Sequence, residues 1–129
     1  MEDLPAFQGI LRILEAGKGL VCASGLAGSS KILLAALLQR RLQKPMLIVS
    51  DNTQQAERTA SDLQFFFSQI AGPSGPSVLA FPSYDIDPYR GLSPHPSLQQ
   101  QRASTLWSLS HSPDQCVVAP IRALLSRTP

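Results

Sequence analysis

Residues 19–42 read GLVCASGLAGSSKILLAALLQRRL, and the predicted fold depends most on this segment. Its first five residues, Gly19 to Ala23, are a short and wholly apolar run, which predicts a β-strand with both faces covered. A loop of small residues follows, and residues 31–42 are rich in leucine and alanine, which predicts a helix with apolar side chains around much of its surface. A strand, a small-residue loop and a helix in this order begin a parallel α/β unit.

The alternation of helices and strands continues on both sides of this stretch. The apolar periodicity predicts further helices at residues 5–16, 52–70 and 97–110 and a last short helix from Pro120. It predicts further strands at residues 45–50, 78–81 and 116–119. We therefore expect an α/β fold in which a parallel sheet carries helices on both faces.

Composition restricts the class of protein. The chain has 129 residues, with 43% hydrophobic and 16% charged residues and a formal net charge of +2. These values fit one globular domain, and the charge is too small to indicate nucleic acid binding. No stretch approaches the ~18 consecutive apolar residues of a membrane span, so we expect a soluble, cytoplasmic protein without a membrane partner. Cys22 and Cys116 each lie in an apolar run, which predicts two buried, reduced thiols and no metal site.

The loop before the second predicted helix resembles a degenerate phosphate-binding loop. The pattern G-x-x-x-x-G-K-[ST] is matched at Gly25 and Lys31, but Ser30 stands in place of the second glycine and Ile32 in place of the hydroxyl residue. An isoleucine cannot coordinate Mg²⁺, so we expect a loop that does not work as a nucleotide site and a chain without catalytic residues. The residues of this degenerate loop are Gly25, Gly28, Ser29, Ser30, Lys31 and Ile32.

An aromatic and basic cluster lies in the proline-rich residues 73–96. Tyr84, Tyr89 and Arg90 are candidates for contact with DNA or with another domain, because tyrosine rings can stack on bases. The alternative, which we favour, is that the two tyrosines pack the loop onto the sheet.

Three motifs in order resemble one protein family. They are GLAGSSK at residues 25–31, FPSYDIDPYRGLSPHPSLQQQRASTLWSL at residues 81–109 and VVAPIRALLSR at residues 117–127. Their spacing is similar to the start of the bacterial transcription-repair coupling factors (Mfd), from about Leu11 to Thr128. Tyr84 departs from the family pattern, since many relatives have tryptophan there.

The resemblance implies a fold and a role. The family's N-terminal module is RecA-like, has the fold of UvrB and has lost its ATP site, so residues 1–129 are expected to be the first part of such a module in a larger protein. The family is a DNA translocase that displaces stalled RNA polymerase and recruits UvrA. Its ATP and Mg²⁺ act in a motor downstream of this segment, which itself needs no cofactor.

Two alternatives stay open from the residues alone. The first is an active, UvrB-like half of an ATP-dependent DNA helicase, which would require a working nucleotide loop and should not tolerate both Ser30 and Ile32. The second is a phosphate-binding α/β module of unrelated function, which leaves the motif at residues 81–109 without an explanation.

Overall fold

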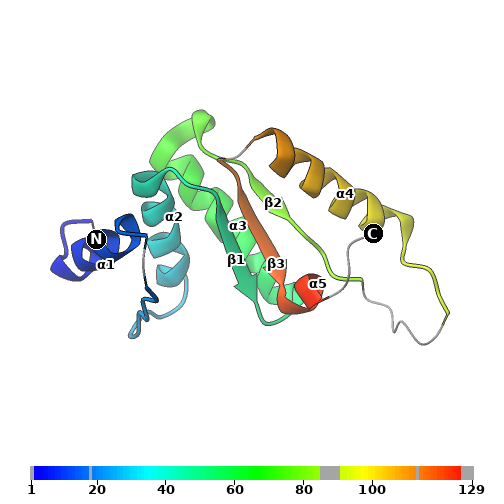
Figure 1. Cartoon of the computed structure of the whole chain (residues 1–129), viewed down its shortest axis with the longest axis horizontal. Coiled ribbons are helices and arrows are strands. Elements are labelled where there is room, and N and C mark those ends of the chain that lie inside the picture. The colour runs from blue at the N-terminus through cyan, green and yellow to red at the C-terminus, as the bar shows by residue number, and fades with distance from the viewer. Residues whose placement is uncertain (1, 18, 85–90, 113, 126–129) are drawn as a thin grey trace.

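The structure is a computed structural model that describes residues 2–17, 19–84, 91–112 and 114–125 (Figure 1). Its elements follow in the order α1 (Pro5–Glu15), α2 (Ser30–Leu42), β1 (Met46–Ser50), α3 (Thr53–Ala71), η1 (Gly72–Ser74), β2 (Val78–Ala80), α4 (Pro96–His111), β3 (Cys116–Pro120) and α5 (Ile121–Leu125). Every predicted element except the strand at residues 19–23 is confirmed to within one residue at each end.

The three strands form one small parallel sheet in the order β1-β3-β2. Met46 lies opposite Cys116 in the first pair, and Val78 lies opposite the same cysteine in the second. The central strand β3 is buried along its whole length, which explains its continuous apolar sequence. The parallel α/β architecture predicted from the sequence is therefore confirmed.

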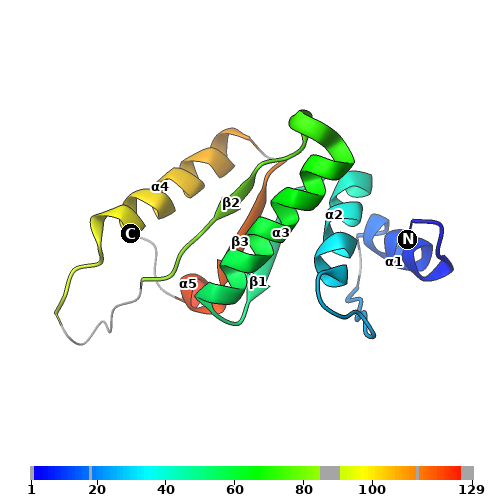
Figure 2. The same cartoon turned by 180° about the vertical axis from the view of Figure 1, so that it is seen from behind.

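Helix α3 covers one face of the sheet, as Figure 2 shows from behind. Leu63 and Phe67 of this helix are buried against Cys116 and Val118 of the central strand, and these four side chains form the centre of the main core. The side chain of Asn52 caps the start of the helix, which removes one of its unpaired backbone donors.

The other face of the sheet is covered only over β2 and β3. There Phe81, Val117, Ala119 and Ala123 form a second buried cluster, and Leu109 of α4 packs against it. Helices therefore lie on both faces, as predicted. Their cover is incomplete at β1, where Leu47 is 55% exposed and Val49 is 47% exposed.

The outer edge of β2 is closed by side chains from two helices. The backbone N–H of Val78 donates a hydrogen bond to Gln64 Oε1 of α3 at 3.3 Å. Thr105 Oγ1 of α4 donates to the carbonyl oxygen of Ala80 at 2.9 Å. The strand thus meets polar partners on both sides, although only one of its neighbours is a strand.

The strand predicted at residues 19–23 is wrong. These residues have no regular structure, and Leu20 is 96% exposed. They link α1 to α2, and these two helices lie on the opposite side of α3 from β2 in both views of the chain (Figures 1 and 2). An apolar strand needs neighbours on its edges and cover on both faces, and the described part of the chain supplies neither at this position.

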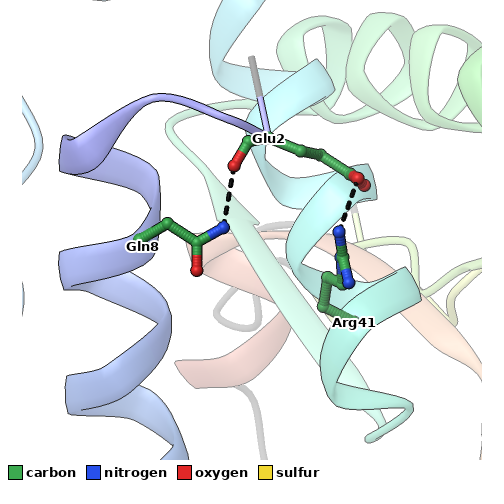
Figure 3. A network of polar contacts seen from close by, with 3 residues as sticks. All are labelled: Glu2, Gln8 and Arg41. Atoms are coloured by element: carbon green, nitrogen blue, oxygen red, sulfur yellow. Dashed lines mark hydrogen bonds and ion pairs between the residues drawn. The ribbon is translucent and has the colours of Figure 1, made fainter.

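Helix α1 packs on α2 through a separate cluster of Phe7, Leu11 and Leu37. Glu2, which precedes α1, contacts both helices, as Figure 3 shows. Its carboxylate pairs with Arg41 of α2 at 2.9 Å, and its backbone carbonyl oxygen accepts a hydrogen bond from the Gln8 side chain of α1 at 2.9 Å. Because the ion pair lies at the surface, we attribute most of the attachment to the apolar cluster.

The two cysteines differ in environment. Cys116 is buried, as predicted, and burial raises the pKa of its thiol from 9.0 to about 11. Cys22 is exposed, so its predicted burial is wrong, and the cause is the absence of the strand in which it was placed. Within the described ranges, no helix combines the length and the apolar character that a membrane crossing requires.

Candidate functional site

The degenerate phosphate loop lies beside a polar hollow at the carboxyl end of β1. The hollow has a volume of about 600 Å³ and lies between the start of α2, the end of β1 and the first three turns of α3. The carboxyl end of a parallel strand is where ligands bind in open α/β sheets. This is therefore the position at which the loop predicted from the sequence has to be tested against its geometry.

Two backbone donors of the loop are bonded within the loop itself. The N–H of Ser30 donates to the carbonyl oxygen of Ala27 at 3.2 Å, and the N–H of Ile32 donates to that of Ser29 at 3.1 Å. The Ser30 hydroxyl also donates to Ala27. Gly28 permits this tight turn because its φ is +55°, in the left-handed region. A loop that cradles phosphate presents its backbone N–H groups to the ligand, whereas the N–H groups of Ser30 and Ile32 donate to carbonyl oxygens of the loop.

The charges around the hollow are mixed. Ser29 Oγ donates a hydrogen bond to the Asp62 carboxylate of α3 at 3.3 Å. Asp51 and Asp62 both line the hollow, and so do Lys31 and Arg58. Two carboxylates so close to the loop offset the attraction of the two cations for an anion.

The Ile32 side chain packs against the core of the protein. It is partly buried and packs against the main cluster that contains Ala36, Ala56 and Leu63. Its side chain offers no oxygen ligand to Mg²⁺, so the residues present at this loop do not fit a metal-bound nucleotide. In the described part of the chain, no group of three His, Cys, Asp or Glu side chains is arranged to hold a metal ion.

The aromatic and basic cluster predicted from the sequence is only partly described. Tyr89 and Arg90 lie outside the described residues. Tyr84 is half-buried, and the guanidinium of Arg102 lies 4.4 Å from the centre of its ring. The same guanidinium lies 4.0 Å from the ring centre of Phe81. This places Tyr84 in a packing contact at the end of β2.

Arg102 is a residue whose role the sequence analysis missed. It is buried, and its Nη1 donates to the carbonyl oxygens of Pro82 at 2.7 Å and of Ala123 at 3.3 Å. It thus joins α4 to the segment after β2 and to α5. Leu98, Arg102, Thr105 and Leu109 follow one another at helical spacing, so the signal was two polar residues on the apolar stripe of a helix.

Two known proteins are similar to nearly the whole chain. The transcription-repair-coupling factor of Myxococcus xanthus is 29% identical over 119 residues, which are 92% of this chain and 10% of that protein. The transcription-repair-coupling factor of Bacillus subtilis is 25% identical over 123 residues, which are 95% of this chain and 10% of that protein. No protein-family model matches the chain.

These similarities confirm the resemblance that the three sequence motifs indicated: the chain is related to a segment of the transcription-repair coupling factors. The chain spans about a tenth of the length of the two relatives it matches.

Proposed function

We propose that this chain is a segment of a transcription-repair coupling factor and forms the first, RecA-like part of its UvrB-like N-terminal module. Its task in this proposal is structural: it does not hydrolyse ATP and helps to carry the surfaces that couple removal of stalled RNA polymerase to UvrA recruitment. The observation that carries the proposal is the similarity of more than nine-tenths of the chain to two such factors. The parallel α/β architecture is consistent with it.

The lack of ATP hydrolysis is supported by the loop before α2. Ile32 packs into the core in place of a hydroxyl ligand, and the N–H groups of Ser30 and Ile32 donate to carbonyl oxygens of the loop itself. The Asp62 carboxylate accepts a hydrogen bond from Ser29, which puts negative charge beside the loop and disfavours a phosphate there. Each feature opposes binding of a Mg²⁺-bound nucleotide, and together they favour a structural role over the helicase alternative.

In this proposal RNA polymerase, double-stranded DNA and UvrA act on the longer protein, and ATP and Mg²⁺ belong to its downstream motor. The contribution of the present chain is to hold neighbouring parts of that protein in place. Tyr84, Tyr89 and Arg90 stay candidates for contact with DNA or with another domain.

A titration with a fluorescent ATP analogue, with and without Mg²⁺, tests the absence of a nucleotide site. We expect no saturable binding to the chain and no difference between the wild type and Lys31→Ala. The exposed Lys44→Ala is the matched control for loss of one positive charge. Micromolar, Mg²⁺-dependent binding that Lys31→Ala abolishes and Lys44→Ala retains would move the helicase alternative into first place.

Survival after ultraviolet irradiation tests the place of the chain in repair. Cells whose longer protein carries Lys31→Ala are expected to survive like the wild type, because this side chain has no metal-bound partner to assist. Cells from which residues 1–129 are deleted are expected to lose transcription-coupled repair. Normal repair in the deletion strain, with the shortened protein present at normal levels, would contradict the proposal.

A further inference from the structure

The outer edge of β1 presents backbone groups that nothing in the described part of the chain pairs with. The N–H of Met46 donates to the carbonyl oxygen of Gln115 at 3.3 Å, so Met46 faces the central strand. Along a strand, successive residues direct their N–H and C=O groups to opposite sides. Ile48 therefore also faces β3, and the backbone groups of Leu47 and Val49 point away from the sheet.

The side chains at this edge are apolar and half-exposed. Leu47 lines a groove of about 300 Å³ whose walls come from β1, β3, α4 and α5 and include Leu106 and Leu124. Both leucines are themselves more than 40% exposed. The unpaired edge and the apolar groove meet at Leu47, so one extended segment could pair with the edge and place side chains in the groove.

At the opposite edge of the sheet, side chains of this chain bond the outward backbone groups. At β2, Gln64 accepts from the outward N–H of Val78, and Thr105 donates to the outward carbonyl of Ala80. Among the described residues, β1 has no such partners at its outer edge, and its sequence MLIVS contains no proline or charged residue to prevent pairing. The outward backbone groups of β2 thus have hydrogen-bond partners in the described structure, whereas those of β1 do not.

We propose that the open edge of β1 takes an additional β-strand from the longer protein, supplied by a segment outside residues 1–129. This inference rests on the proposed function, since the chain spans about a tenth of its relatives and a longer protein would supply the strand. The chemistry of the groove requires a strand with apolar residues at alternate positions, so that one row of side chains covers Leu47 and Val49.

Residue-resolved hydrogen–deuterium exchange by mass spectrometry tests the proposal in the longer protein and in this chain alone. The amides of Leu47 and Val49 are expected to exchange rapidly in the chain alone and at least ~100-fold more slowly in the longer protein, because pairing protects them. The amide of Ile48, which faces β3, is the internal control and is expected to be slow in both.

Two proline variants, Val49→Pro and Ile48→Pro, form a matched pair for the same exchange experiment. Val49→Pro removes an outward donor and leaves the N–H groups that face β3 in place. In the longer protein it is expected to accelerate exchange at Leu47, while exchange at Ile48 in the chain alone stays as in the wild type. Ile48→Pro removes a donor of the existing sheet and is expected to accelerate exchange in both proteins. The wild-type comparison decides the proposal even if a proline variant does not fold.

The outcomes separate the alternatives. Rapid exchange at Leu47 and Val49 in the longer protein would overturn the inference and leave the proposed function intact. Slow exchange in the chain alone would also overturn it: dependence on protein concentration would identify a second copy as the occupant, and independence would identify residues 19–23. If this chain turns out not to be part of a longer protein, the proposed function fails as well.

Discussion

The two edges of the small sheet are finished in different ways. At β2, the chain supplies Gln64 and Thr105, whose side chains meet the outward backbone groups of Val78 and Ala80. At β1, Leu47 and Val49 are half-exposed, and no described segment pairs with the outer edge of the strand, which is bonded to β3 on its other side. A folded chain normally protects both edges of a sheet. The chain itself therefore closes the edge at β2, whereas in our proposal a segment of the longer protein completes the edge at β1.

The same contrast extends to the two faces. The face under α3 is the main core and is complete within the chain. The opposite face is complete over β3 and exposed over β1. We therefore expect substitutions under α3 to change the stability of this chain, and substitutions at the outer edge of β1 to change the pairing that we propose for that edge.

The largest contrast is expected between two leucine truncations. Leu63 is 0% exposed under α3, so Leu63→Ala leaves a cavity and is expected to lower the free energy of unfolding by about 2–5 kcal/mol. Leu47→Ala removes a half-exposed side chain at the open edge and is expected to change it by about 0.5 kcal/mol or less in the chain alone. Denaturant unfolding measures both, and equal losses would break the distinction between the two sides.

The next largest effect is expected at Arg102, which joins α4 to the segment after β2 and to α5. Arg102→Ala is expected to lower the free energy of unfolding by about 3 kcal/mol, because the carbonyl oxygens of Pro82 and Ala123 lose a charged donor. Arg58→Ala, which removes an exposed arginine of α3, is the control and is expected to have little effect. Similar thermal shifts for the two variants would argue against the role assigned to Arg102.

A smaller effect is expected at the closed edge itself. Thr105→Val keeps the shape of the side chain and removes the hydrogen bond to Ala80, for an expected loss of about 1 kcal/mol. Ser104→Ala, at the exposed neighbouring position, is expected to leave stability unchanged. If Thr105→Val is as stable as the wild type, the hydroxyl does not contribute to closing this edge.

A separate effect, expected only at alkaline pH, is a pH dependence at the central strand. Burial raises the pKa of Cys116 from 9.0 to about 11, so the folded chain holds this proton more tightly than the unfolded chain. The resulting stability is fully present below pH 9 and is lost as the pH rises toward 11, with a slope of at most about 1.4 kcal/mol per pH unit. Cys116→Ala is expected to reduce this slope, and an identical slope in the variant would contradict the assignment.

The sequence predicted the helices and the three sheet strands well because their patterns are local. Alternation of long apolar runs with amphipathic stretches was enough to place β3 and α3 within a residue. The prediction of a strand at residues 19–23 was wrong because a strand depends on neighbouring strands and covering helices, about which a local pattern carries no information. Arg102 was missed for the same reason: its partners, Pro82 and Ala123, lie about twenty residues away on either side.

The loop at residues 25–32 shows a second limit. The substitutions at Ser30 and Ile32 are visible in the sequence, and the expectation that no metal-bound nucleotide fits this loop stays a prediction. The sequence could not show that Asp62, on another helix, contacts Ser29, because that pairing follows from how α2 packs on α3.

Amide exchange in the chain alone, measured residue by residue by NMR spectroscopy, tests the difference between the two edges most directly. The outward N–H of Val78 is bonded to Gln64, and the outward N–H of Val49 has no partner in the described structure. We predict that Val78 exchanges slowly and Val49 rapidly, at every protein concentration. Exchange at Val49 as slow as at Val78 would mean that the chain closes both edges itself, which would contradict the account.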